Sequence, residues 1–210
     1  MTVPAREVSQ QRLDQLSSAI LRHVPKQKYT VADRLEEQAA AHPNRPFLFF
    51  EDSRISYGEL NAAANRVAHA AMRAGLVTGD VVALMMENRP EFIITWAGLA
   101  KLGVTVALLN SNVGGQPLRH ALDTTRATHL IVGSECVDKV ASLGGDIAGV
   151  RTIYVSADPA SAPERVEAPA GAVHLTTLLA QMPTENPDAA LRQTLVAGDD
   201  LFYMFTSGTT

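Results

Sequence analysis

The sequence predicts an α/β fold in which a doubly wound, mostly parallel sheet is flanked by helices. Two features predict it. Short apolar runs, such as residues 81–86, alternate with longer segments whose apolar residues recur at helical spacing. The runs are apolar at every position, as expected of strands that are covered on both faces, and strands joined through helices form parallel sheets.

The first 80 residues are predicted to form three helices and a hairpin. Residues 8–24 have one apolar face, which predicts a helix packed on the body of the protein; nearby arginines and lysines also fit contact with a membrane surface. A second helix is expected to begin after Thr30 and a third after Ser56. Between them, Phe47–Phe50 is expected to pair with a strand that begins at Ile55.

Capping patterns define the ends of these helices. Glu59 follows Ser56 by three residues, which is a capping box. Thr30 and Asp33 form a similar arrangement, with aspartate in place of the usual glutamate or glutamine. Gly75 is expected to end the third helix because glycine adopts the left-handed turn most readily.

From residue 81 onward, strands and helices are expected to alternate. The predicted strands are 81–86, 104–109, 129–132, 151–155, 173–176 and 201–205. The predicted helices are 90–103, 117–125 and 188–196, and the stretch 157–171, rich in proline and alanine, is expected to be a surface loop.

Composition and charge exclude several classes of function. The 210 residues are 46% hydrophobic and 19% charged, as in ordinary globular proteins, with a net charge of −4 and no basic run, so no nucleic-acid partner is expected. A single cysteine excludes an intrachain disulfide, and no secretory signal precedes the first helix, which together predict a cytoplasmic location. Residues 92–109 are the longest apolar stretch, but they contain Lys101 and two glycines and fit a helix followed by a strand rather than a membrane span.

The scattered polar residues predict little catalytic chemistry. The six histidines lack metal-ligand spacing, so no metal site is expected within the chain. Cys136 is expected to be a passive thiol, and Asp199 and Asp200 to be solvated turn residues. Asn110, at the end of a predicted strand, either faces a ligand at the carboxyl edge of the sheet or caps a turn.

The last five residues, Thr206, Ser207, Gly208, Thr209 and Thr210, follow an aromatic strand that is expected to be buried. Glycine lets the backbone turn so that its N–H groups approach an anion, and the hydroxyls add donors for phosphate oxygens. Taken alone, these residues equally fit a polar turn after an edge strand. The patterns G-x-x-x-x-G-K-[ST] and G-x-G-x-x-G are absent from the chain.

This motif resembles the signature of the adenylate-forming superfamily of acyl-CoA synthetases, luciferases and peptide-synthetase adenylation domains, where it continues as Gly-x-Pro-Lys. Upstream segments resemble that superfamily in the same order: residues 42–46, 55–61, 75–83, 87–92 and 103–110. Four further segments are most like the very-long-chain acyl-CoA synthetase and fatty acid transport branch: residues 109–112, 118–122, 129–133 and 205–207.

The resemblance implies the N-terminal part of a larger enzyme, a fatty acid–CoA ligase that uses ATP to form an acyl-adenylate. Residues 206–210 would hold the β- and γ-phosphates of ATP. No residue is assigned as catalytic or as a metal ligand, because the loop lysine, the magnesium-binding glutamate and the acyl pocket are expected beyond Thr210. This piece alone is therefore expected to be inactive. Residues 1–28 are predicted to be a helical extension and 29–210 the first part of the large AMP-binding domain.

Two other interpretations share the same fold. One is a binding or interaction module without catalysis, and the other is an adenylation domain that activates amino or aryl acids. The expected cofactors are ATP, magnesium and CoA, and the expected substrate is a fatty acid or another carboxylic acid. The resemblance leaves open both peripheral association with a membrane and a homodimer.

Overall fold

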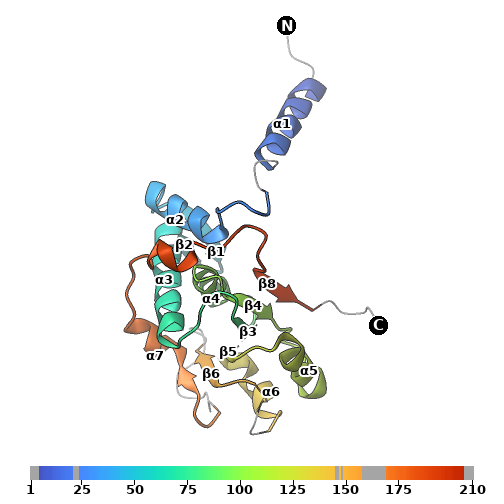
Figure 1. Cartoon of the computed structure of the whole chain (residues 1–210), viewed down its shortest axis with the longest axis vertical. Helices are drawn as coiled ribbons and strands as arrows, with labels where there is room; N and C mark the ends of the chain where they lie inside the picture. Colours follow the sequence, from blue (N-terminus) through green and yellow to red (C-terminus); the bar gives the residue numbers. More distant parts are fainter. Residues whose placement is uncertain (1–4, 21–23, 145–146, 148, 158–168, 206–210) are drawn as a thin grey trace.

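The computed structural model describes residues 5–20, 24–144, 147, 149–157 and 169–205. Figure 1 shows the arrangement of its elements. The helices are α1 (Ala5–Ile20), α2 (Val31–Ala41), α3 (Tyr57–Arg73), α4 (Pro90–Ala100), α5 (Gly115–Thr125), α6 (Val137–Ala141) and α7 (Leu175–Ala180), with 3-10 turns η1 (Ser134–Cys136) and η3 (Ala189–Arg192). The strands are β1 (Pro46–Phe50), β2 (Ser53–Ser56), β3 (Val81–Met85), β4 (Thr105–Leu108), β5 (His129–Gly133), β6 (Thr152–Ser156), β7 (Val173–His174) and β8 (Phe202–Met204).

Six of the strands form one parallel sheet. Its order is β7-β6-β5-β3-β4-β8, and each neighbouring pair is parallel. In its centre, Ala83 lies opposite Ala107 on one side and Leu130 on the other. β1 and β2 form a separate antiparallel hairpin. The predicted doubly wound α/β fold and the predicted hairpin are both confirmed.

Helices cover both faces of the sheet. Val82 and Leu84 of β3 belong to a core cluster with residues of α3 and α4, whereas Ala83 and Met85 belong to a second cluster with residues of α5 and α6. All four side chains are fully buried. Because successive side chains of a strand point to opposite faces, a strand covered on both faces has to be apolar throughout.

The predicted helix ends are also present. The amide of Glu59 donates to Ser56 Oγ at 3.3 Å, and the amide of Ser56 donates to Glu59 Oε2 at 2.8 Å, which completes the capping box of α3. After α3 the chain turns at Gly75, where φ is +79°. The predicted inner face of α3 is buried: Leu60, Ala64, Val67, Ala68 and Ala71.

The first helix does not pack as predicted. In Figure 1, α1 extends away from the other elements, and its Leu13 and Leu16 are 56% and 59% exposed. The prediction of a helix packed on the body is therefore wrong for the described residues. The apolar stripe of α1 is narrow, since only a few residues of this polar helix contribute to it. No helix in the described parts of the chain is long and apolar enough to cross a membrane.

The last strand also differs from its prediction. β8 was expected to be buried, but Phe202, Tyr203 and Met204 are 42%, 37% and 63% exposed. The reason is that β8 lies at the edge of the sheet and pairs with β4 alone within the described chain. The predicted strand at 173–176 is reduced to two residues, because α7 begins at Leu175. Most of the predicted loop at 157–171 lies outside the described residues.

Candidate functional site

The switch point of the sheet lies between β3 and β5, because the connections that leave these two neighbouring strands run to opposite faces of the sheet. After β3 the chain passes to α4 on one face, and after β5 it passes to α6 on the other. Parallel α/β sheets commonly bind ligands at such a switch point, in a crevice outside the carboxyl ends of the two strands. β8 runs parallel to β4, so Met204 ends at this same edge. The predicted site residues Thr206, Ser207, Gly208, Thr209 and Thr210 follow it and lie outside the described residues.

A buried arginine joins three of the strand ends at this edge. Arg89 is the N-cap residue of α4, just beyond β3, and 7% of its side chain is exposed. Its guanidinium donates to the carbonyl oxygens of Ser156 at 3.0 Å and Ala157 at 2.9 Å, at the end of β6. It also forms ion pairs with Glu91 at 3.2 Å and with Glu135, beyond β5, at 3.6 Å. These partners offset the cost of removing the charge from water.

Glu135 completes the crosslink from the other side. Its Oε1 accepts a hydrogen bond from the amide of Glu87 at 2.8 Å, which ties the chain leaving β5 to the chain leaving β3. The Glu135 carboxylate occupies the space that a Cβ on Gly133 would need, so a side chain at position 133 would displace the carboxylate from the crosslink. A guanidinium remains charged and offers no lone pair, so Arg89 can orient and neutralise but cannot act as a base. The pair therefore serves to hold the edge in shape.

Cys136 and Asn110, two candidate residues near this edge, have structural roles. Burial, together with the charge of Glu135, raises the pKa of Cys136 to about 11. A thiol in this state is a poor nucleophile, which confirms the prediction of a passive residue. Asn110 Oδ1 accepts a hydrogen bond from the amide of Asn112 at 2.9 Å, so of its two predicted roles the structure shows the turn cap.

Among the described residues, the aspartate pair and the histidines do not gather into a metal site. Asp199 accepts a hydrogen bond from the amide of Val196 at 2.9 Å, and Asp200 accepts one from the hydroxyl of Tyr203 at 3.0 Å. Both contacts are exposed, as predicted for turn residues. Within the described ranges, no group of three or more histidine, cysteine, aspartate or glutamate side chains could hold a metal ion.

A doubly wound parallel sheet with a switch point between β3 and β5 is the architecture in which many α/β domains bind ligands at the carboxyl edge. Residues 35–210 match the AMP-binding enzyme family over most of the chain. The chain belongs to this family, which confirms the resemblance to adenylate-forming enzymes.

The relatives agree with the predicted branch. Long-chain fatty acid transport protein 1 of Bos taurus is 36% identical over 194 residues, which cover 90% of this chain and 29% of that protein. A medium/long-chain-fatty-acid–CoA ligase of Mycobacterium tuberculosis is 34% identical over 190 residues, which cover 89% of this chain and 28% of that ligase. The chain thus spans less than a third of the length of these relatives.

Solved structures agree with the fold. An anthranilate CoA ligase, crystallised in complex with anthranoyl-AMP, superposes with a TM-score of 0.66 at 22% identity. The match covers 84% of this chain and 30% of the ligase. At this level of identity the likeness supports the architecture of the sheet and helices.

Sequence reasoning missed the Arg89–Glu135 crosslink. Arg89 lies in a segment that resembles the family, but its sequence neighbourhood predicts only the residue before a helix that begins at Pro90. Its partners Glu135 and Ser156 are 46 and 67 positions away in the chain. The available signal is a charged residue within four positions of the end of each of two buried strands.

Proposed function

We propose that this chain is the N-terminal part of an ATP-dependent, AMP-forming fatty acid–CoA ligase, which joins a carboxylic acid to CoA through an acyl-adenylate. The family match carries the proposal, because it runs from residue 35 to residue 210 and so includes the hydroxyl-rich motif. The names of the two relatives support a fatty acid as substrate. The anthranoyl-AMP in the solved ligase supports an acyl-adenylate as the intermediate.

The proposed role of Thr206, Ser207, Gly208, Thr209 and Thr210 is to bind the β- and γ-phosphates of ATP. Hydroxyls and turn N–H groups fit phosphate oxygens chemically, and Met204, the last residue of β8, lies at the carboxyl edge of the sheet. Positioning and charge stabilisation are the main demands of phosphate chemistry. Magnesium and CoA are the further proposed cofactors. In this proposal residues 1–28 are an extension and 29–210 begin the AMP-binding domain.

Exchange of labelled pyrophosphate into ATP tests the substrate class. The full-length protein is expected to catalyse this exchange in the presence of fatty acids, because adenylate formation is reversible. Parallel assays with aryl and amino acids separate the alternatives. Exchange that depends on amino acids alone would replace the fatty acid proposal with an amino acid adenylation domain. No exchange with any acid, from a folded full-length protein, would favour a binding module without catalysis.

Replacement of one hydroxyl tests the phosphate role. In the full-length protein, Thr209→Ala is expected to slow pyrophosphate exchange about tenfold or more, because one preorganised donor is lost. The unfolding midpoint should stay close to that of the unmodified protein. Thr176→Ala, at an exposed position on α7, is the matched control and is expected to leave exchange unchanged. Equal exchange rates in the two variants would contradict the phosphate role of Thr209.

A further inference from the structure

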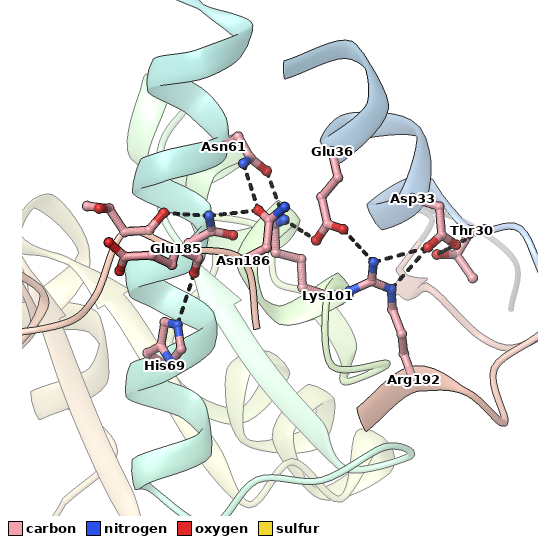
Figure 2. Close-up of polar contacts among 11 residues, drawn as sticks. Thr30, Asp33, Glu36, Asn61, His69, Lys101, Glu185, Asn186 and Arg192 are labelled. Atoms are coloured by element: carbon pink, nitrogen blue, oxygen red, sulfur yellow. Dashed lines mark hydrogen bonds and ion pairs between the residues drawn. The ribbon is translucent and has the colours of Figure 1, made fainter. Parts of the chain in front are cut away.

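A polar network at the amino edge of the sheet joins α2, α3 and α4 to the chain that leads into β8 (Figure 2). Its centre is Glu36 of α2, which accepts hydrogen bonds from Lys101 Nζ at 2.6 Å and from the Arg192 guanidinium at 2.5 Å. Lys101 also donates to Asn61 Oδ1 at 2.8 Å, and Arg192 donates to Asp33 Oδ1 at 3.1 Å. We refer to Asp33, Glu36, Asn61, Lys101 and Arg192 as the Glu36 network.

The charges of this network are largely removed from water. The side chains of Lys101, Arg192 and Glu36 are 0%, 6% and 16% exposed. Burial lowers the pKa of Lys101, and its bond to Glu36 offsets this in part. Burial would also lower the pKa of Arg192, but the bonds to Glu36 and Asp33 outweigh it and raise that pKa. Moving Arg192 away would remove an ion-pair partner from both Glu36 and Asp33, so the network favours one position for Arg192.

The chain between α7 and β8 depends on such contacts. This return segment, residues 181–201, contains only the short turn η3 as regular structure. Side chains of α3 hold its first part: Asn61 and Asn65 both donate to Asn186 Oδ1, at 2.8 and 2.9 Å, and His69 Nε2 lies 3.0 Å from the Glu185 carbonyl oxygen. Arg192 is the next anchor along the chain (Figure 2).

Close contacts continue from Arg192 to the start of β8. Leu195 packs against Gly103 so tightly that a Cβ at Gly103 would lie 2.5 Å from Leu195 Cδ2. The Thr105 hydroxyl, at the start of β4, donates to the carbonyl of Asp200 at 2.9 Å. Between these points, the amides of 197 and 198 donate to the carbonyls of 27 and 25, each at 2.8 Å. A continuous set of contacts therefore runs from Glu36 to β8.

β8 itself can do little to fix its own position. It has three residues, one partner strand within the described chain, and exposed side chains. Short edge strands without a buried face have weakly specified register. The place of β8 on β4 must therefore be set mainly by the anchors that precede it.

We propose that Arg192 is a positioning residue: it fixes the place of β8, the strand that leads to the proposed ATP-binding motif. Through Glu36 and Lys101 it fixes where the return segment meets β4, and hence where the chain leaves β8 for the motif that begins at Thr206. The effect on ATP rests on the proposed function, whereas the effect on β8 does not.

The test compares Arg192→Met with Arg34→Met in the full-length protein. Arg34 is a matched control because it is also paired with a glutamate, Glu37, but both side chains are more than half exposed, at 61% and 57%. Arg192→Met is expected to lower the hydrogen-exchange protection of the β8 amides about tenfold, equivalent to about 1.4 kcal/mol, while β3 keeps its protection. The KM for ATP should rise several-fold and the KM for the fatty acid should not change. Arg34→Met should match the unmodified protein in all of these.

Arg192→Lys provides a graded variant. Lysine keeps the positive charge but lacks the planar guanidinium that reaches both Asp33 and Glu36, so an intermediate effect is expected. If Arg192→Met fails to fold, Arg192→Lys is the variant that decides the test. Unchanged β8 protection in the folded variants overturns the proposal, and so does an equal loss at β3 and β8 with both KM values unchanged. Lost β8 protection with an unchanged KM for ATP overturns the link to ATP. If the unmodified protein shows no acid-dependent exchange, the proposed function fails, while β8 protection still decides the role of Arg192.

Discussion

The centre of the sheet and the Glu36 network hold the chain by opposite means. In the centre, β3 is buried between two layers of helices and contributes apolar side chains to both. In the network, four charged groups share a small buried volume and are held by hydrogen bonds of defined direction. Apolar packing contributes most of the stabilisation of a domain and tolerates repacking, whereas a buried polar group contributes only when its partners are in place.

Apolar packing and buried polar contacts position different parts of the chain. The strands of the centre are long enough to be fixed by their own ladders and by the layers that cover them. The return segment has neither a ladder nor a continuous apolar face, so directional contacts determine its path. The carboxyl edge follows the same rule, because Arg89 and Glu135 tie together chains that have just left the sheet. Both edges therefore place polar contacts where the chain is least constrained by packing.

The largest effect is expected from removing the carboxylate at the centre of the network. Glu36→Ala leaves Lys101 and Arg192 as buried cations with their main partner gone. Breaking a buried ion pair in this way costs about 3–5 kcal/mol. The measurement is the free energy of unfolding in urea, followed by the fluorescence of Trp96, which is the single tryptophan of the chain.

A triple variant separates two contributions to the free energy of unfolding: the cost of leaving buried charges without partners and the net contribution of the intact network. Replacing Glu36, Lys101 and Arg192 together by leucine and two methionines removes all three charges at once. This variant is expected to be more stable than Glu36→Ala, because the charge that it leaves without an ion-pair partner, Asp33, is 29% exposed and keeps its hydrogen bonds from Thr30. If the triple variant is less stable than Glu36→Ala, the intact network contributes net stability. The role of the network would then extend beyond fixing the position of the return segment.

A slightly smaller loss is expected from a cavity in the centre of the sheet. Leu84 is fully buried between β3 and the helices α3 and α4. Leu84→Ala is expected to cost about 2–5 kcal/mol in the same unfolding assay, whereas Leu84→Met, which conserves volume, should cost less than about 1.5 kcal/mol. Equal losses for the two variants would mean that shape, and not buried volume, limits stability at this position.

Local patterns in the sequence predicted the elements that local forces determine. The capping box at Ser56 and the glycine that ends α3 act within a few residues, and both are present. The apolar run of β3 likewise reports burial on both faces. In contrast, α7 was missed because it has six residues, two of them threonines, and follows a segment with strand character.

Features that depend on distant pairing could not be read from the sequence. Whether β8 is central or at an edge depends on which strand pairs with it, and its aromatic residues suggested burial. Arg192 and Glu36 are 156 positions apart, so neither residue predicts the other. For the candidate site, the sequence predicted the motif at residues 206–210, and that assignment stays a prediction. The Arg89–Glu135 crosslink beside it required the folded sheet.

A milder loss of stability is expected from acidification, because the buried imidazole of His129 lies in the sheet. His129 begins β5, is 6% exposed and stacks on Tyr154 with 6.1 Å between ring centres. Burial lowers the pKa of His129, the charge of Arg151 lowers it further, and Asp80 offsets part of this. The unfolded chain, with an ordinary histidine pKa of about 6.5, therefore binds the proton more tightly than the folded chain.

Stability is consequently expected to fall as the pH decreases below about 6.5 and to level off below the folded pKa of His129. His129→Phe keeps a ring beside Tyr154 but cannot be protonated, so its free energy of unfolding should change less than that of the unmodified chain between about pH 7 and about pH 5. His120→Gln, at an exposed position on α5, should leave the pH dependence as it is. If His129→Phe loses as much stability on acidification as the unmodified chain, then another group is responsible, and the apolar centre of the sheet is insensitive to pH in this range.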